Sequence, residues 1–213
     1  MKKNEKENKN KPQEKTKSKI REYAEAIVIA ILIAVLIRTF IIQAYKIPSK
    51  SMVPTLLVGD HLLVNKFIYG VKIPVIRKTV LPVTDPKQGD IIVFIYPEDR
   101  SKDYIKRVIG VAGDKIEIRD KKIFINDQRY DDSWGIYTDS QSLPQDVRDY
   151  FGPVVVPPDS LFVMGDNRDQ SADSRYWGFV DIKDVEGKAL ILYWSWDSED
   201  FALRWNRLGK LLH

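Results

Sequence analysis

The sequence contains no cysteine and only two histidines, His61 and His213, among its 213 residues. The absence of cysteine excludes disulfide frameworks, cysteine nucleophiles and zinc sites built on thiolates. Two histidines leave little material for a Ser-His-Asp triad or for a helix with two metal-binding histidines. We therefore expect no metal and no cofactor, and any hydrolytic chemistry must use another base.

Surplus positive charge is lacking outside the N-terminal tail. Residues 1–22 hold nine Lys/Arg and four Glu, whereas the remaining 191 residues carry a net charge of about −1. A nucleic-acid-binding domain would spread basic side chains over a face of its fold. We therefore expect no nucleic-acid partner, and the tail is interpreted as the charged flank of the segment that follows it.

One long hydrophobic run follows this tail. Residues 26–37 are twelve uninterrupted apolar positions, and residues 23–42 contain only Glu25 and Arg38 as charged side chains. A helix of this length spans about 30 Å, the thickness of the hydrocarbon core of a bilayer. A cleaved signal peptide and a buried core helix are the alternatives. The long preceding tail and the apolarity around the whole helix favour a transmembrane anchor over residues 23–43.

The charge distribution predicts the orientation of this anchor. By the positive-inside rule, the basic tail lies in the cytoplasm and the chain from about residue 45 lies across the membrane. We therefore expect a single-pass protein of the plasma membrane, with the lipid bilayer as a partner and an extracytoplasmic domain.

The rest of the chain is patterned as short strands with turn signals between them. We predict a mostly β domain formed by residues 44–126 and 154–213. Residues 127–153, rich in Asp, Tyr, Ser and Gln, interrupt this pattern and are expected to form an inserted lobe or long loop. The last strand is expected to place Trp194 in the core. The predicted strands are residues 61–66, 90–96, 104–111, 115–118, 122–126, 160–164 and 189–196.

Three polar segments carry candidate chemistry, and the first directly follows the predicted anchor. It reads Ile-Pro-Ser-Lys-Ser-Met-Val-Pro-Thr over residues 47–55. Because the prolines fix an irregular, extended path, Ser49 and Ser51 are presented from a rigid loop, from which a hydroxyl can be aimed. A linker whose serines cap turns would give the same pattern.

The second segment places two basic residues, Lys106 and Arg107, side by side in a strand with apolar residues on both sides. Strand alternation sends one of them to each face, and we expect one face to be buried. A buried lysine is either a salt-bridge partner or an uncharged base, because burying an unpaired ammonium is costly. Periodicity does not decide which of the two points inward, and charges on an edge strand remain an alternative.

The third segment, residues 163–178, follows a strand and contains the run Gly-Asp-Asn-Arg-Asp-Gln-Ser-Ala-Asp-Ser-Arg. As a calcium loop it fails, because Arg168, Gln170, Ser171 and Trp177 occupy positions that need other residue types. A polar network that supports an active site fits better than a charged surface loop.

Together, in this order and with the Gly89-Asp90 strand between them, the anchor and the three segments resemble the bacterial type I signal peptidases. These are membrane-bound serine proteases with a Ser-Lys dyad, and the resemblance extends from the anchor to Trp196. It implies an antiparallel, barrel-like β catalytic domain behind one transmembrane helix. It also implies an endopeptidase that cleaves secreted preproteins after small residues at positions −1 and −3.

The resemblance also implies roles for individual residues. Ser51 would be the nucleophile and Lys106 the general base, while the Ser49 hydroxyl and the Ser51 backbone N–H would form an oxyanion hole. Without histidine or cysteine, a lysine can serve as this base only if its pKa falls from about 10.4 to near neutrality, a shift that burial can supply.

Further residues are expected to support the site. By the resemblance, Ser171 would orient the lysine amine by a hydrogen bond, and Asp173 and Arg175 would buttress the site. Met52 and Pro54 are expected to bind substrate. Gln170 departs from the family pattern, in which many members carry Asn at this position.

Two other functions remain open at this stage. A self-cleaving Ser-Lys repressor would need a DNA-binding domain and no membrane anchor, so residues 1–44 disfavour it. A non-catalytic, membrane-tethered β scaffold would be favoured by a separation of more than about 4 Å between the Ser51 hydroxyl and the Lys106 amine.

Overall fold

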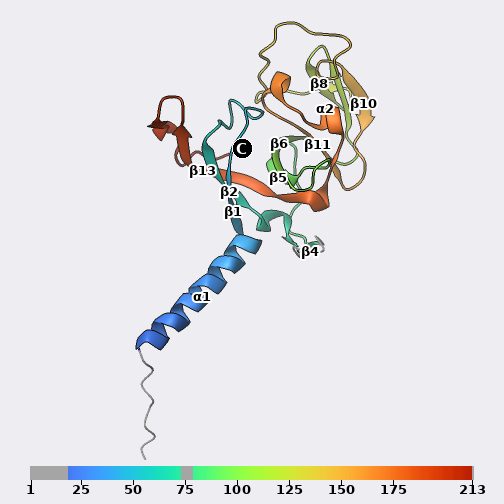
Figure 1. Ribbon diagram of the computed structural model, residues 1–213. Coiled ribbons are helices and arrows are strands. Elements are labelled where there is room, and N and C mark those ends of the chain that lie inside the picture. The colour runs from blue at the N-terminus through green and yellow to red at the C-terminus, as the bar shows by residue number, and fades with distance from the viewer. Residues whose placement is uncertain (1–18, 73–78, 213) are drawn as a thin grey trace, which may run out of the picture. The chain divides into compact units, whose positions relative to one another are not determined.

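The computed structural model describes residues 19–72 and 79–212. Most of the predicted basic tail, together with His213, lies outside these residues. The chain divides into two compact units, Met1–Leu36 and Ile37–His213, and each is described by itself. Figure 1 shows the ribbon with its elements labelled.

The apolar run forms the helix α1 (Lys19–Phe40), which begins four residues before the predicted anchor. None of its residues is buried, so a core helix does not describe it. By length and composition α1 can cross a membrane, and it fits a single-pass anchor. It ends earlier than predicted, because Gln43 pairs with Val64 in a β-sheet.

The second unit is mostly β and antiparallel, which confirms the predicted fold class. Its main sheet has the strand order β1-β2-β13-β5-β6-β11-β12, with β14 paired to β13. Among the described residues no pairing joins β12 to β1, so this sheet is not a closed barrel. Its strands are β1 (Ile42–Lys46), β2 (Asp60–Asn65), β5 (Ile91–Ile95), β6 (Asp103–Gly110), β11 (Ser160–Met164), β12 (Val180–Asp181), β13 (Val185–Asp197) and β14 (Ala202–Leu203).

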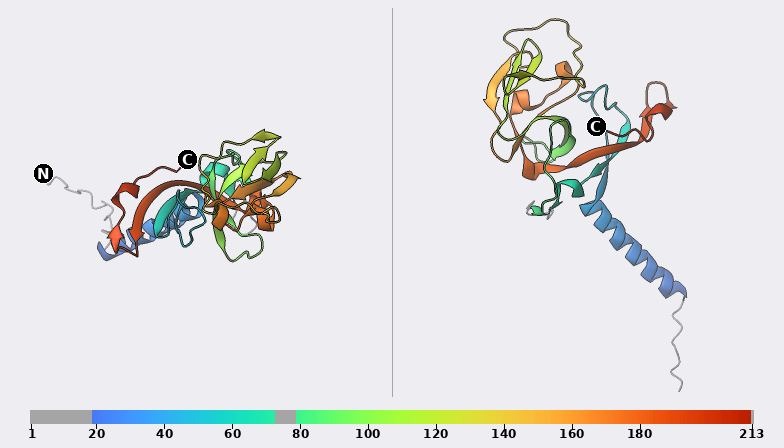
Figure 2. Two further views of the ribbon diagram at one scale, coloured as in Figure 1. Left: turned by 90° about the horizontal axis from the view of Figure 1, so that it is seen from above. Right: turned by 180° about the vertical axis from the view of Figure 1, so that it is seen from behind.

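A smaller sheet of order β10-β7-β8-β9 extends the unit. In Figures 1 and 2 it lies at the opposite end from the hairpin of β13 and β14. Its strands are β7 (Lys115–Arg119), β8 (Lys122–Ile125), β9 (Gln128–Arg129) and β10 (Phe151–Val155), and β3 (Val71–Lys72) pairs separately with β4 (Thr79–Leu81). Residues 127–153, the expected insertion, therefore contain β9 and the start of β10 with irregular chain between them.

Helical structure in the second unit is limited to short pieces. The four-residue helix α2 (Ser174–Trp177) lies in the third polar segment, and the short 3-10 helices are η1 (Phe67–Tyr69), η2 (Arg168–Gln170), η3 (Ile182–Asp184) and η4 (Trp205–Arg207). This agrees with the prediction of a mostly β domain.

The core explains why β5 lacks a polar face. Alternate residues of β5 join different apolar clusters: Ile91 and Val93 pack in one, and Ile92 and Phe94 in the other. Every residue of β5 is buried, as is β6 from Lys106 onward. A strand covered on both faces reads as a continuous apolar run.

The end of β13 corrects one expectation. Trp194 was expected in the core, but its side chain is 42% exposed. β13 pairs with β5 only as far as Lys188, and Trp194 lies beyond that pairing, opposite His61 of β2. Its side chain therefore lies on the part of the strand that extends past β5.

Candidate active site

The Ser51 segment is an irregular turn between β1 and β2 that is held by buried apolar side chains. Leu56 N–H donates to the Met52 carbonyl, and Gly59 N–H donates to the Ile47 carbonyl. Ile47, Met52 and Leu56 all pack in one core cluster. Met52 is only 1% exposed, so this side chain, expected to bind substrate, anchors the turn in the core instead.

Lys106 lies on β6 with its amine against the Ser51 hydroxyl. Its Nζ donates to Ser51 Oγ at 2.8 Å and to the Ile105 carbonyl at 3.2 Å. The side chain is 4% exposed, and this burial lowers the pKa of Lys106 to about 8, against the opposing effect of the Asp173 and Asp166 carboxylates. The amine is therefore uncharged in about a tenth of the molecules at pH 7, far more than for an ordinary lysine.

The dyad opens into a cavity of about 420 Å³. Ser49 is exposed there, and its Oγ is 3.4 Å from Ser51 Oγ. Pro54 is exposed but does not line this cavity. The described residues include no group of three or more His, Cys, Asp or Glu side chains that could hold a metal ion. The cavity is lined by Pro48, Ser49, Lys50, Ser51, Asp103, Tyr104, Ile105, Lys106, Gln170 and Ala172.

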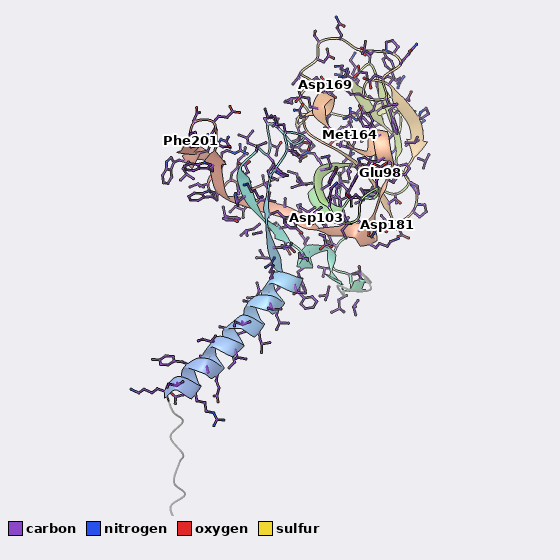
Figure 3. The ribbon with its side chains drawn as sticks, viewed as in Figure 1. Glu98, Asp103, Met164, Asp169, Asp181 and Phe201 are labelled. Carbon is purple, nitrogen blue, oxygen red and sulfur yellow. The ribbon has the colours of Figure 1, made fainter. Side chains whose placement is uncertain are left out.

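The pairing of β6 with β11 brings the third polar segment to the dyad. Met164, the last residue of β11, is paired with Arg107 of β6. Figure 3 labels Met164 together with Asp103, the first residue of β6. Because β11 ends at this register position, the chain that follows Met164 lies next to Lys106 and Ser51.

Arg107, on the other face of β6, links three segments of the site. Its guanidinium donates twice to Asp166, with both distances 2.8 Å, and once to the Gly89 carbonyl at 2.7 Å. Asp166 also accepts a hydrogen bond from the Thr55 hydroxyl at 2.5 Å. Arg107 and Asp166 are fully buried, so this ion pair ties β6, the third segment and the Ser51 turn together.

Gly165 allows the closest approach between the third segment and the Ser51 turn. A Cβ at this position would overlap the Ser51 carbonyl oxygen and the Ser171 side chain. Ser171 Oγ is buried but makes no hydrogen bond. The hydrogen bond from Ser171 to the Lys106 amine, which the resemblance implies, is therefore absent from this structure.

Asp173 and Arg175 form a buried ion pair that stabilises the third polar segment. Asp173 accepts from Arg175 Nε at 2.8 Å and from the Gly165 N–H at 3.1 Å. Arg175 also donates to the Arg148 and Arg168 carbonyls. Burial favours a raised pKa for Asp173, but the adjacent Arg175 guanidinium outweighs it and keeps the pKa of this carboxyl below its ordinary value.

Three residues of the site received no role from the sequence: Thr55, Asp166 and Asn167. Thr55 and Asp166 belong to the buried network described above. Asn167 N–H donates to the Ser51 carbonyl at 3.1 Å, and its Nδ2 donates to the Lys50 carbonyl at 3.2 Å. The available signal was the run of polar residues at the end of an apolar strand, a place where side chains reach another segment.

Several known proteins are similar to this chain in sequence. The family model described as "Signal peptidase, peptidase S26" matches residues 20–194. Signal peptidase I of Pseudomonas fluorescens is 39% identical over 191 residues, which cover 75% of this chain and 67% of that protein. Signal peptidase I of Buchnera aphidicola subsp. Acyrthosiphon pisum is 36% identical in an alignment 241 positions long, which covers 82% of this chain and 76% of that protein.

Among solved structures, a crystal structure of a signal peptidase I from Enterococcus faecalis V583 aligns with 30% identity and a TM-score of 0.41. The alignment covers 49% of this chain and 97% of the chain in that crystal structure. The family model extends over most of the sequence, and the two relatives cover three quarters or more of it. The chain therefore belongs to the signal peptidase family, peptidase S26.

Proposed function

We propose that this chain is a membrane-anchored serine endopeptidase that removes signal peptides from secreted preproteins. The proposal rests on membership of the peptidase family, on relatives that carry the name Signal peptidase I, and on the geometry of two side chains. The observation that carries it is the 2.8 Å contact between Lys106 Nζ and Ser51 Oγ. A serine hydroxyl in contact with a buried amine of lowered pKa is suited to acyl transfer.

In the proposed reaction, Ser51 Oγ attacks the carbonyl carbon of the scissile peptide bond while the neutral Lys106 amine takes the hydroxyl proton. The tetrahedral intermediate collapses when the C–N bond breaks and Lys106 returns the proton to the leaving amine. Water, deprotonated by Lys106, then hydrolyses the resulting ester and frees Ser51. The Ser51 N–H and the Ser49 hydroxyl stabilise the oxyanion in both halves.

The finer features of the proposal concern substrate and location. The substrate is an extended segment of a preprotein that adds a strand beside the Ser51 turn and has small residues at positions −1 and −3. The N-terminal tail lies in the cytoplasm, α1 spans the bilayer once, and the β unit acts outside. Support for this orientation comes from the basic residues that precede α1.

Cleavage of a preprotein by the detergent-solubilised full-length chain tests the proposal. Ser51→Ala should leave the preprotein intact, whereas Ser198→Ala, which changes an exposed serine, should cleave like wild type. N-terminal sequencing of the product should find the cut after a small residue. An intact preprotein with the wild type would favour the scaffold, and cleavage of the chain itself in place of the preprotein would favour the repressor-type protease.

A further inference from the structure

Asn167 holds both peptide carbonyls that flank the Ser51 side chain. Its backbone N–H donates to the Ser51 carbonyl at 3.1 Å, and its side-chain Nδ2 donates to the Lys50 carbonyl at 3.2 Å. Asn167 is 4% exposed, and it lies 117 residues from Lys50 in the sequence. The Lys50 carbonyl also accepts from the Val53 N–H at 3.2 Å within the turn, so Asn167 is the contact that ties these two successive peptide groups to the third segment.

The position of the Lys50 carbonyl determines where the Ser51 N–H points. Both groups belong to one peptide unit, which is planar and, in the trans form, directs its C=O and N–H in opposite directions. Because Asn167 binds the carbonyl, the N–H points away from Asn167. Within the described part of the chain, the Ser51 N–H donates no hydrogen bond. It is thus left available on the side of the cavity that Ser49 and Ser51 line.

The surroundings of the Asn167 amide determine which end of it faces Lys50. Nδ2 is 3.4 Å from Gln170 Oε1 as well as 3.2 Å from the Lys50 carbonyl, so two oxygen acceptors face the same end of the amide. A flipped amide would place Oδ1 against both oxygens. In the observed orientation Oδ1 is buried without a partner, which is costly. The contact with Lys50 is thus made at the expense of an unsatisfied acceptor.

We propose that Asn167 is a positioning residue that pre-orients the Lys50–Ser51 peptide so that its N–H faces the developing oxyanion. This inference rests on the proposed function and adds a residue to it. Without the Asn167 amide, the Lys50 carbonyl keeps only the Val53 N–H of its own turn, so the Lys50–Ser51 peptide is held less firmly and its N–H faces the oxyanion in fewer molecules. The proton affinity of Lys106 does not depend on this contact, because Asn167 carries no charge and does not bond to the amine.

Kinetics of Asn167→Ala with a peptide substrate provide the first test. We expect kcat to fall about 10- to 100-fold, up to the scale of a lost oxyanion donor, with little change in KM. The affinity for a peptide aldehyde, whose adduct with Ser51 carries the oxyanion, should fall by a similar factor. The midpoint of the pH-rate profile should not move. Gln141→Ala, which changes an exposed amide outside this cavity, should stay within about threefold of wild type in kcat.

Asn167→Leu separates positioning from packing, because it keeps a side chain of similar size but removes the Nδ2 donor and adds no buried charge. It should lose about as much kcat as Asn167→Ala, whereas a residue needed only for packing would tolerate it. Near-wild-type kcat of Asn167→Leu, or an unchanged aldehyde affinity of Asn167→Ala, would overturn the inference. Activity retained by Ser51→Ala would instead overturn the proposed function, so the two failures are distinguishable.

Discussion

Lys106 and Arg107 are neighbours on β6 and are buried on opposite faces of it. The partners of their two basic groups differ. The Arg107 guanidinium is fully buried against Asp166 with two parallel hydrogen bonds. The Lys106 amine has no carboxylate within ion-pairing distance among the described residues and contacts the Ser51 hydroxyl instead. Burial therefore lowers the pKa of Lys106 to about 8.

The difference shows how one strand can supply both the proposed base, Lys106, and an ion pair that joins segments of the site, Arg107 with Asp166. A guanidinium remains protonated at any physiological pH, so it suits a permanent ion pair with fixed bidentate geometry. An amine that lacks a carboxylate partner can lose its proton when it is desolvated. The amine beside the proposed nucleophile can therefore change its charge, whereas the guanidinium that joins the segments forms a permanent ion pair.

The largest expected effect comes from replacing Lys106 with arginine, so that both faces of β6 carry a guanidinium. Lys106→Arg should lower preprotein cleavage at least about 1,000-fold, because a guanidinium cannot accept the Ser51 proton. The loss should match that of Lys106→Ala in the same assay with detergent-solubilised protein. Thermal unfolding of both variants serves as the control for folding. Substantial cleavage by Lys106→Arg would contradict the assignment of Lys106 as general base.

Breaking the ion pair between Arg107 and Asp166 should mainly lower the stability of the fold. Arg107→Ala leaves the Asp166 carboxylate buried without its partner, and we expect a loss of about 3–5 kcal/mol in the free energy of unfolding. The double variant Arg107→Met with Asp166→Leu removes both charges and should recover most of this loss. Denaturant titration of the three proteins measures the effect. A loss below about 1 kcal/mol in Arg107→Ala would mean that the pair does not hold the segments together.

The pH dependence isolates the titration of Lys106. The ratio kcat/KM should rise with pH and level off above an apparent pKa near 8, because the base must be neutral. Between about pH 8 and 10.5 the unfolded chain keeps this proton and the folded chain does not, so stability should rise with pH across that window.

The size of this gain follows from the same shift. Relative to Lys106→Met, the wild type should gain about 3 kcal/mol in the free energy of unfolding from the low to the high end of the window. Denaturant titrations of both proteins at several pH values measure it. A flat difference between them would show that the pKa of Lys106 is not lowered in the folded state.

Features of the site that depend on local sequence patterns could be predicted, whereas those that depend on long-range contacts could not. Strand positions such as residues 160–164 follow from local apolar runs and turn signals, and β11 has these bounds. The contact between Ser51 and Lys106 was expected only from the resemblance, because no local pattern relates two residues 55 positions apart. Burial of both faces of β6 depends on the elements packed over each face, which strand periodicity does not report. The core position of Met52 was missed for the same reason.

Ser171 tests how closely the Lys106 face must be held, and we expect the smallest effect here. Its Oγ is buried without a hydrogen bond, so Ser171→Ala removes an unsatisfied polar atom and should leave the free energy of unfolding unchanged or slightly higher. If the serine orients the amine during the reaction, as the resemblance implies, kcat should still fall about 10-fold with little change in KM.

The result separates three roles for this serine. A fall in kcat at undiminished stability means that the hydroxyl bonds to Lys106 only while the amine moves toward the reacting Ser51, a contact that the resting structure lacks. A rise in KM with unchanged kcat would make Ser171 a substrate-binding residue. If neither constant changes, the close packing of Ser171 against Gly165 is its only role, and Lys106 is oriented by burial and its contacts with Ser51 and Ile105 alone.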